Sequence, residues 1–374
     1  MQYEYISADN HLDKLWIPGN LWRERLPAHL REAGPKIVES DSGTSWEWEG
    51  RLRGAAADGA DNAKYIERFR SKGANIEDGA LPPSEAEYLL EHMDMSKIYA
   101  GVTFGDVRKW DVADPELLVA VYRAYNDFVL EINQANPDRL VMLPNIPTAL
   151  PEACPAEIER VAKLGARGVE FCPFDVGKPV YDEVWEATWA AAEDTGLAIC
   201  AHIGGKADSA VPPYGRGASI AFLSTAPFNI ANTCAELIFS AVFERHPKLQ
   251  WLFGECRIGW LPFFIQWMDR QVVERKPDAG VPITLLPSEY IDRQIRFAFE
   301  EDYIGTRLLE FDWSKIQNCV VWGSDYPHDQ GTWPDVSPPL DKMFEGIDPT
   351  LRKAVLFDRT AEMFGIKGPY TKDR

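Results

Sequence analysis

Four residues with side chains that can bind transition metals stand at the ends of apolar, strand-like runs in the sequence. Asp9 and His11 stand two apart in ADNH, His202 stands in AHIG, and Asp325 stands in WGSDYPH. Two imidazoles and two carboxylates form a mixed nitrogen and oxygen set that suits a divalent cation. We therefore expect one divalent metal ion, zinc in preference to manganese, with coordination positions left open for water and substrate.

Each of these residues also has an ordinary structural explanation. An Asp-x-His pair at a strand end is often a turn or cap device, a lone histidine such as His202 is often hydrogen-bonded within a core, and Ser324-Asp325 can cap a loop. The chain has only six histidines, however, and two of them stand with carboxylates at the ends of apolar runs. This coincidence favours a metal site.

A metal site of this kind predicts a hydrolase. The cation lowers the pKa of its bound water, and Asp325 can take the proton and later return it to the leaving group. The apolar run CVVW would then end on a carboxylate because the reaction requires a base beside a metal. A barrel that has lost its chemistry and serves as a scaffold is the alternative, but it would not be expected to keep all four ligands.

Eight β-rich runs alternate with helical patterns and would position these residues. Helices are indicated by Asp114-Pro115 at one start and by Gly165 and Gly196 at two ends. The strand-like runs are residues 3–11, 97–104, 139–147, 166–173, 197–204, 249–255, 295–301 and 318–327.

Eight mostly apolar strands joined by helical crossovers predict an α/β fold, a (β/α)8 TIM barrel. Asp9, His11, His202 and Asp325 would then meet at the carboxyl ends of the strands, where such barrels place their active sites. An open doubly wound sheet is the rival, but it would normally show a glycine-rich turn after its first strand, and ADNHLDKLW has none.

We expect residues 1–374 to form a single barrel domain with an insertion after the first strand. Residues 16–90 are rich in Trp, Gly, Pro and charge. They are expected to form an irregular flap over the barrel mouth or an oligomer contact.

The composition excludes several classes of partner. There are 39 Lys and Arg against 58 Asp and Glu, and the net charge of −19 disfavours nucleic acid and anionic membranes. No apolar run is long enough for a membrane span, and the charged N-terminus lacks the apolar core of a signal peptide. Six scattered cysteines without C-x-x-C spacing predict free thiols. We expect a cytoplasmic enzyme acting on a small molecule.

Several blocks of the sequence resemble a known family. ADNH, GVEFCPF, AHIGG, FSAVFERHPKLQWLFGECRIGWLPFFIQWMDR and VVWGSDYPHDQGTWP are similar to the amidohydrolase-related branch of the metal-dependent amidohydrolase superfamily. This branch contains aminocarboxymuconate semialdehyde decarboxylase and the dihydroxybenzoate decarboxylases. The resemblance implies a distorted barrel, one divalent metal ion and a homodimer or higher homo-oligomer. It also implies metal ligands at Asp9, His11, His202 and Asp325.

The sequence departs from this pattern after the sixth strand. The family's decarboxylases carry a catalytic histidine there, whereas FGECRIG places Glu255 at that position. A carboxylate cannot be the same proton donor at neutral pH unless its pKa is strongly raised. Hydrolysis with Asp325 and Glu255 as catalytic residues is therefore our first prediction. A non-oxidative decarboxylase, a carbon-carbon lyase or a hydratase acting on an aromatic or enol acid is the alternative.

Four further residues are candidates for substrate binding. His328 follows the last strand, Arg257 follows the sixth, and Tyr214 and Arg216 follow the fifth in VPPYGRGAS. The arginines could bind an anionic or phenolic group, although exposed arginine is common in loops. The 13 tryptophans suggest an aromatic or cyclic substrate, but most of them can simply fill the core.

Overall fold

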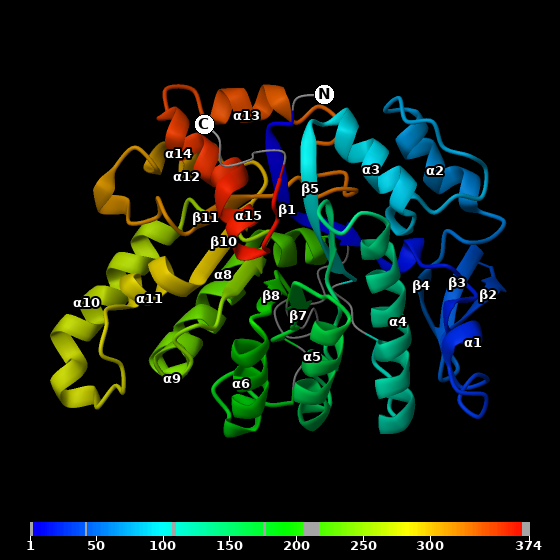
Figure 1. The fold of residues 1–374 in the computed structure, drawn as a ribbon, viewed down its shortest axis with the longest axis horizontal. Helices are drawn as coiled ribbons and strands as arrows, with labels where there is room; N and C mark the ends of the chain where they lie inside the picture. The colour runs from blue at the N-terminus through cyan, green and yellow to red at the C-terminus, as the bar shows by residue number, and fades with distance from the viewer. Residues whose placement is uncertain (1–2, 42, 107–109, 175–176, 205–216, 369–374) are drawn as a thin grey trace.

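The eight expected strands are all present and parallel in the computed structural model, which describes residues 3–41, 43–106, 110–174, 177–204 and 217–368. They lie at the centre of the molecule (Figure 1). Their bounds are β1 (Tyr5–Leu12), β5 (Ile98–Gly105), β6 (Leu140–Met142), β7 (Gly168–Glu170), β8 (Ala198–His202), β9 (Trp251–Gly254), β10 (Ile295–Phe299) and β11 (Val320–Trp322).

The strands close into a distorted barrel. Continuous pairing gives two sheets, one with the order β1-β5-β6 and one with the order β11-β10-β9-β8-β7. Single parallel bridges join them at Asn145 with Glu170 and at Asn10 with Tyr326. The predicted barrel is therefore confirmed, and its distortion lies at the two seams where the pairing shrinks to one bridge.

Helices surround the strands, and their ends follow the sequence signals. The Asp114 side chain accepts a hydrogen bond from Leu117 N–H at 2.8 Å, and Gly196 has a φ of 71° after α6. In Figure 1, α4, α5 and α6 stand along one side of the sheet. The helices after the insertion are α4 (Pro115–Ala135), α5 (Cys154–Lys163), α6 (Glu186–Thr195), α8 (Gly217–Phe239), α9 (Val242–Arg245), α10 (Leu261–Ala279), α11 (Pro287–Gln294), α12 (Tyr303–Leu308), α13 (Ser337–Met343), α14 (Pro349–Lys353) and α15 (Arg359–Met363).

Among the described residues, no helix combines the length and the apolar character that a bilayer crossing requires. The six cysteines are free and buried, as expected.

The insertion contains regular structure that its composition did not indicate. An antiparallel sheet is formed by β2 (Lys36–Ser40), β3 (Gly43–Trp48) and β4 (Arg51–Ala55). It turns at Gly43 and Gly50, which have positive φ angles of 102° and 71°. The segment also forms α1 (Leu21–Arg25), α2 (Asn62–Arg70) and α3 (Ala86–Met95).

Helices α2 and α3 hold the loop that follows β11. Arg68 of α2 donates hydrogen bonds to the carbonyl of Pro327 and to Asp329. His92 of α3 pairs with the Tyr326 hydroxyl at 2.7 Å through Nδ1. The insertion thus packs against the segment that carries Asp325.

Acid is expected to destabilise the protein through His92. Burial lowers the pKa of this imidazole to about 4 from its ordinary 6.5. Between these values the unfolded chain binds a proton that the folded protein does not, so stability falls as the pH drops from 6.5 to 4. At about 1.4 kcal/mol per pKa unit, the difference between 6.5 and 4 corresponds to a loss of about 3.5 kcal/mol in the free energy of unfolding.

The check is urea unfolding of chelated protein at pH 7 and pH 4.5. The His92→Gln variant is expected to lose less free energy of unfolding than the wild type over this range. His29, whose side chain is 63% exposed, supplies the His29→Gln control. Equal losses in the wild type and His92→Gln would refute the assignment.

Candidate metal-binding active site

The four predicted metal ligands converge at the carboxyl ends of β1, β8 and β11. The His11 Nε2 atom lies 3.3 Å from Asp9 Oδ1 and 3.2 Å from Asp325 Oδ1. The His202 Nε2 atom lies 3.7 Å from Asp9 Oδ2. All four residues are buried. Residues that are separated by up to 316 positions in the sequence (325 − 9) therefore form one cluster.

Two glycines leave room for this cluster. A Cβ atom on Gly254 would lie 2.8 Å from His202 Cδ2 and 2.9 Å from Asp9 Oδ2. A Cβ atom on Gly323 would lie 2.4 Å from Asp9 Cβ. Both contacts are closer than van der Waals packing allows, so Gly254 at the end of β9 and Gly323 directly after β11 permit the strand ends to approach.

Backbone conformation then aims the side chains that follow the strands. Asp325 has a φ of 55° and Glu255 has a φ of 49°. A residue with a Cβ in this left-handed region is strained by about 1–3 kcal/mol, and such strain gathers at functional sites. The Asp325 N–H is held by the Asp9 carbonyl at 2.9 Å, which fixes its strand end against β1.

Glu255 joins the cluster at its edge. Its N–H donates to Asp9 Oδ2 at 2.6 Å, and its Oε2 atom lies 3.3 Å from His202 Nε2. The Glu255 side chain is 14% exposed, whereas that of Asp9 is fully buried. Burial, followed by the charges of Asp325 and Asp9, raises the pKa of Glu255 to about 7.

His328 lies over the cluster and is held by two carboxylates. Its Nδ1–H donates to Asp325 Oδ1 at 2.7 Å, and its Nε2–H donates to Asp13 Oδ2 at 3.0 Å. Its ring stacks on that of His11 with centroids 4.1 Å apart. Burial and the charge of His11 lower its pKa, but the hydrogen bonds to Asp13 and Asp325 outweigh them and raise it to about 9.

These neighbours decide the charge of Asp325. Burial alone would raise its pKa, but the close imidazole of His11 and the hydrogen bond from His328 hold the pKa well below the usual range. Asp325 is therefore an ionised carboxylate. Burial lowers the pKa of His202 to about 4, so this imidazole is neutral and can offer a lone pair.

The residues present fit a divalent cation. Asp9 Oδ1, His11 Nε2 and His202 Nε2 are buried and have no hydrogen-bond partner among the described residues. The His202 Nδ1 atom faces the Ile203 carbonyl at 3.1 Å, which leaves Nε2 for a metal. Bonds of about 2.0–2.2 Å place ligand atoms about 3–4.4 Å apart, and the distances between the donor atoms match this range.

Among the expected substrate-binding residues, the structure places His328 at the cluster and Arg257 two residues after Glu255, beyond the end of β9. The Arg257 guanidinium lies 3.0 Å from Glu300 rather than against a metal-ligating side chain. Tyr214 and Arg216 lie outside the described residues. Asp13 and Glu300 were not predicted from the sequence as site residues. Asp13 could have been, because it stands two positions after His11, as His11 stands two positions after Asp9.

A comparison with protein families decides the classification. The model of the amidohydrolase family matches residues 82–366, more than half of the chain. The chain belongs to the amidohydrolase family. A search of curated proteins found no match.

Solved structures resemble this amidohydrolase over nearly its whole length. The amidohydrolase map2389c from Mycobacterium avium subsp. paratuberculosis K-10 has a TM-score of 0.72 at 19% identity, covering 98% of this chain and 99% of its own. The 5-carboxyvanillate decarboxylase LigW from Sphingomonas paucimobilis has a TM-score of 0.66 at 19% identity, covering 98% and 100%. A dihydroxybenzoic acid decarboxylase from Polaromonas sp. JS666, solved with manganese and 2-nitroresorcinol, has a TM-score of 0.64 at 15% identity, covering 98% of both chains. These similarities confirm the barrel fold of the amidohydrolase.

Removal of metal is expected to destabilise this amidohydrolase. Chelation should lower the melting temperature. Manganese or zinc added at 100 times its Kd should increase the free energy of unfolding by about 2.7 kcal/mol. The measurement is thermal unfolding with elemental analysis of wild type, His202→Ala and the control His29→Ala. His202→Ala should lose both the metal and the stabilisation, while His29→Ala keeps both. Stoichiometric metal in His202→Ala would contradict the assignment.

Proposed function

We propose that this amidohydrolase is a metal-dependent, non-oxidative decarboxylase of an aromatic carboxylic acid. The observation that carries the proposal is a buried set of two imidazoles and three carboxylates, with Glu255 at its edge, in a barrel that matches aromatic-acid decarboxylases along its full length. The reaction breaks the bond between the ring carbon and the carboxylate, releases carbon dioxide and adds one proton to that carbon.

The proposed ligands of the cation are Asp9, His11, His202 and Asp325. When bound, the cation would supply a positive charge that binds the substrate's carboxylate and stabilises negative charge on the ring. The comparisons modify our expectation of zinc. The Polaromonas decarboxylase was solved with manganese, and carboxylates are two of the four proposed ligands here, which manganese accepts together with imidazole.

Glu255 is the proposed proton donor. It stands beside His202, and it is more exposed than the buried Asp9, so it can exchange protons with solvent. A carboxyl can replace a histidine as proton donor at neutral pH only if its pKa is strongly raised. Burial is the largest cause that raises the pKa of Glu255, to about 7, so Glu255 meets this condition. A proton held on Glu255 would pass to the ring carbon as carbon dioxide leaves.

Asp325 and His328 would position the reacting groups. Asp325 stays ionised between His11 and His328, and Asp13 holds the other nitrogen of His328. This arrangement fixes the orientation of the imidazole at the mouth of the site. His328 would then donate a hydrogen bond to a substrate oxygen only by exchanging one of these two partners.

Hydrolysis, our first prediction from the sequence, is retained as a second candidate. The observation in its favour is the ionised Asp325 in the cluster, because a carboxylate is the base that metal-bound water requires. The comparisons support decarboxylation better, since aromatic-acid decarboxylases are among the full-length structural matches.

Product analysis tests the proposal. Metal-loaded protein is incubated with hydroxybenzoates and carboxylated phenols, and in parallel with esters, lactones and amides. Carbon dioxide in the headspace and the matching phenol are expected from the acids only. Turnover of an ester, lactone or amide without release of carbon dioxide would overturn the proposal and restore the hydrolase.

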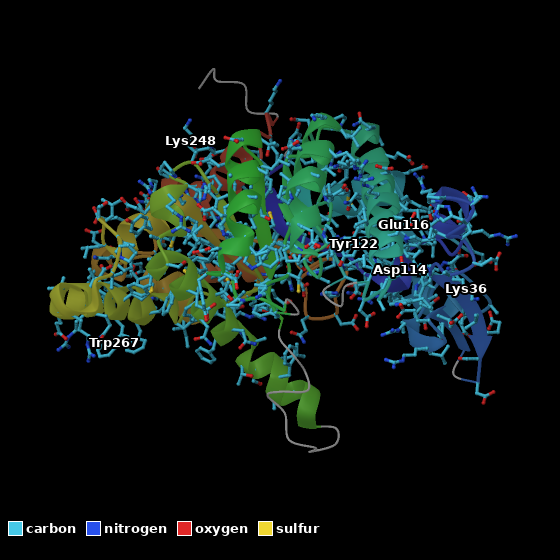
Figure 2. The ribbon with its side chains drawn as sticks, turned by 90° about the horizontal axis from the view of Figure 1, so that it is seen from below. Lys36, Asp114, Glu116, Tyr122, Lys248 and Trp267 are labelled. Atoms are coloured by element: carbon cyan, nitrogen blue, oxygen red, sulfur yellow. The ribbon has the colours of Figure 1, made fainter. Side chains whose placement is uncertain are left out.

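We also propose that the protein forms a homodimer. Helix α10 exposes Phe263, Trp267 and Val273, and Gln266 of this helix donates to the Trp313 carbonyl. Trp267 lies at the outer edge of the molecule (Figure 2). Burial of this apolar face against a second copy would remove it from water. A single sedimenting species of 42.2 kDa would contradict this assembly.

A further inference from the structure

We propose that Arg257 and Glu300 form a subsite for a second anionic group on the substrate. The inference rests on the proposed function, because it adds a second carboxylate, or a group of similar charge, to the aromatic acid. The substrate class would then be an aromatic dicarboxylate rather than a simple benzoate.

Arg257 presents unused hydrogen-bond donors beside the candidate active site. Its Nη1 group donates to the Glu301 carbonyl at 2.7 Å and lies 3.0 Å from Glu300 Oε2. Within the described part of the chain, its Nε and Nη2 groups have no hydrogen-bond partner, and its side chain is 34% exposed. Two N–H groups in a rigid plane match the two oxygens of a carboxylate.

Glu300 contacts this guanidinium through Oε2. It follows β10 directly, is 1% exposed, and neither of its carboxylate oxygens has a hydrogen-bond partner among the described residues. Burial raises the pKa of the Glu300 carboxyl well above the usual range; the charge of Arg257 lowers this pKa, and the charges of Glu255, Asp325 and Asp9 raise it further. The same carboxyl therefore contacts Arg257 and is electrostatically coupled to the metal-binding cluster.

The chain places Arg257 in a conformation that does not favour a side chain. Its φ is 54°, which is left-handed backbone that glycine adopts freely and that other residues adopt at a cost. Arg257 stands two positions after Glu255, whose φ of 49° turns the chain in the same way. This strained turn directs Glu255 to the cluster and Arg257 to Glu300, so one loop supplies the proposed proton donor and a cation beside it.

Charge complementarity gives the subsite its ligand class. Asp9 and Asp325 add carboxylates to this end of the barrel, and the protein as a whole carries a net charge of −19. A second anionic group on the substrate would be repelled here without a fixed cation. Arg257 supplies that cation at the ends of β9 and β10.

The test compares Arg257→Gly, Glu300→Gln and the control Arg270→Ala with the wild type. Glycine suits the backbone at position 257, so Arg257→Gly should fold without strain. Arg270 lies on α10 and its side chain is 63% exposed. Calorimetry measures the binding of benzoate and isophthalate to metal-loaded protein, and kcat/KM is measured for a hydroxybenzoate and a hydroxyisophthalate.

The wild type and Arg270→Ala are expected to bind isophthalate about 10- to 100-fold more tightly than benzoate, as a charged hydrogen-bonded pair allows. Arg257→Gly should abolish this preference, and Glu300→Gln should reduce it. Equal binding of the two probes by the wild type, an unchanged preference in Arg257→Gly, or absence of isophthalate binding would overturn the subsite. An isophthalate preference without release of carbon dioxide from either acid would reject the reaction and keep the subsite.

Discussion

Replacement of Asp325 by asparagine is expected to lower kcat by about 10³-fold, because it removes a charged group at the centre of the proposed site. Asparagine keeps the shape of the side chain but removes its charge. The carboxylate accepts from His328 at 2.7 Å and lies 3.2 Å from His11 Nε2. Its loss would leave His11 with one carboxylate neighbour and His328 with Asp13 alone, and it would remove one proposed ligand.

The measurement combines kcat, stoichiometric metal analysis and thermal unfolding. Asp325→Asn is expected to bind less metal at a given free concentration, with residual kcat remaining low when metal is saturating. Asp335 is exposed in the same loop, so Asp335→Asn is the matched control and should behave as the wild type. Full activity of Asp325→Asn at saturating metal would show that the carboxylate has no part in the reaction.

The convergence of the four residues could be predicted because the alternation of strands with helical crossovers indicates that the strands are parallel. Apolar runs of β-branched residues identified each strand, and parallel strands in a closed barrel gather their carboxyl ends on one face. A polar residue at such an end must therefore face the same cleft as its counterparts. Asp9 and His11 share one face of β1 because side chains alternate along a strand, and His202 ends β8.

Other features depend on interactions that the pattern does not record. The antiparallel sheet of residues 36–55 was not anticipated because its strands are short and polar on one face and the tryptophans that bury the other face come from distant segments. Trp46 packs on Trp22 and on Trp110, with ring centroids 5.1 Å and 6.0 Å apart. Tertiary burial, not local propensity, stabilises such strands.

Glu300 was missed for a related reason. It stands first in the run EED after β10, and successive acidic residues usually indicate a solvated loop. The structure buries this carboxyl beside Arg257 while Glu301 stays exposed. Which of two adjacent carboxylates turns inward depends on the backbone after the strand, and single-sequence patterns carry little information on that choice. The position of Glu300 at a strand end, which is also the feature that drew attention to Asp325, is the signal in the sequence that points to this carboxyl.

Replacement of Glu255 by glutamine is the second change with a large expected effect, about 10²- to 10⁴-fold on kcat, because glutamine cannot donate a carboxylic proton. Metal content should stay near that of the wild type, since Asp9, His11, His202 and Asp325 are all retained. The Glu274→Gln variant on α10, where the side chain is 47% exposed, is the matched control. Metal lost together with activity would instead make Glu255 a ligand.

The pH dependence of Glu255 distinguishes the two candidate reactions. Its pKa is raised to about 7, so the protonated form predominates below pH 7 and is lost above it. A proton donor therefore predicts that kcat declines as the pH rises through 7, whereas a base that activates water predicts that kcat increases over the same range. Glu255→Gln should abolish this pH dependence. Glu255→His places an imidazole at the position that the family resemblance assigns to a catalytic histidine. This variant should restore part of the release of carbon dioxide. An increase of kcat with pH that disappears in Glu255→Gln would assign Glu255 as a base and favour hydrolysis, because decarboxylation needs a proton delivered to carbon and hydrolysis needs one removed from water.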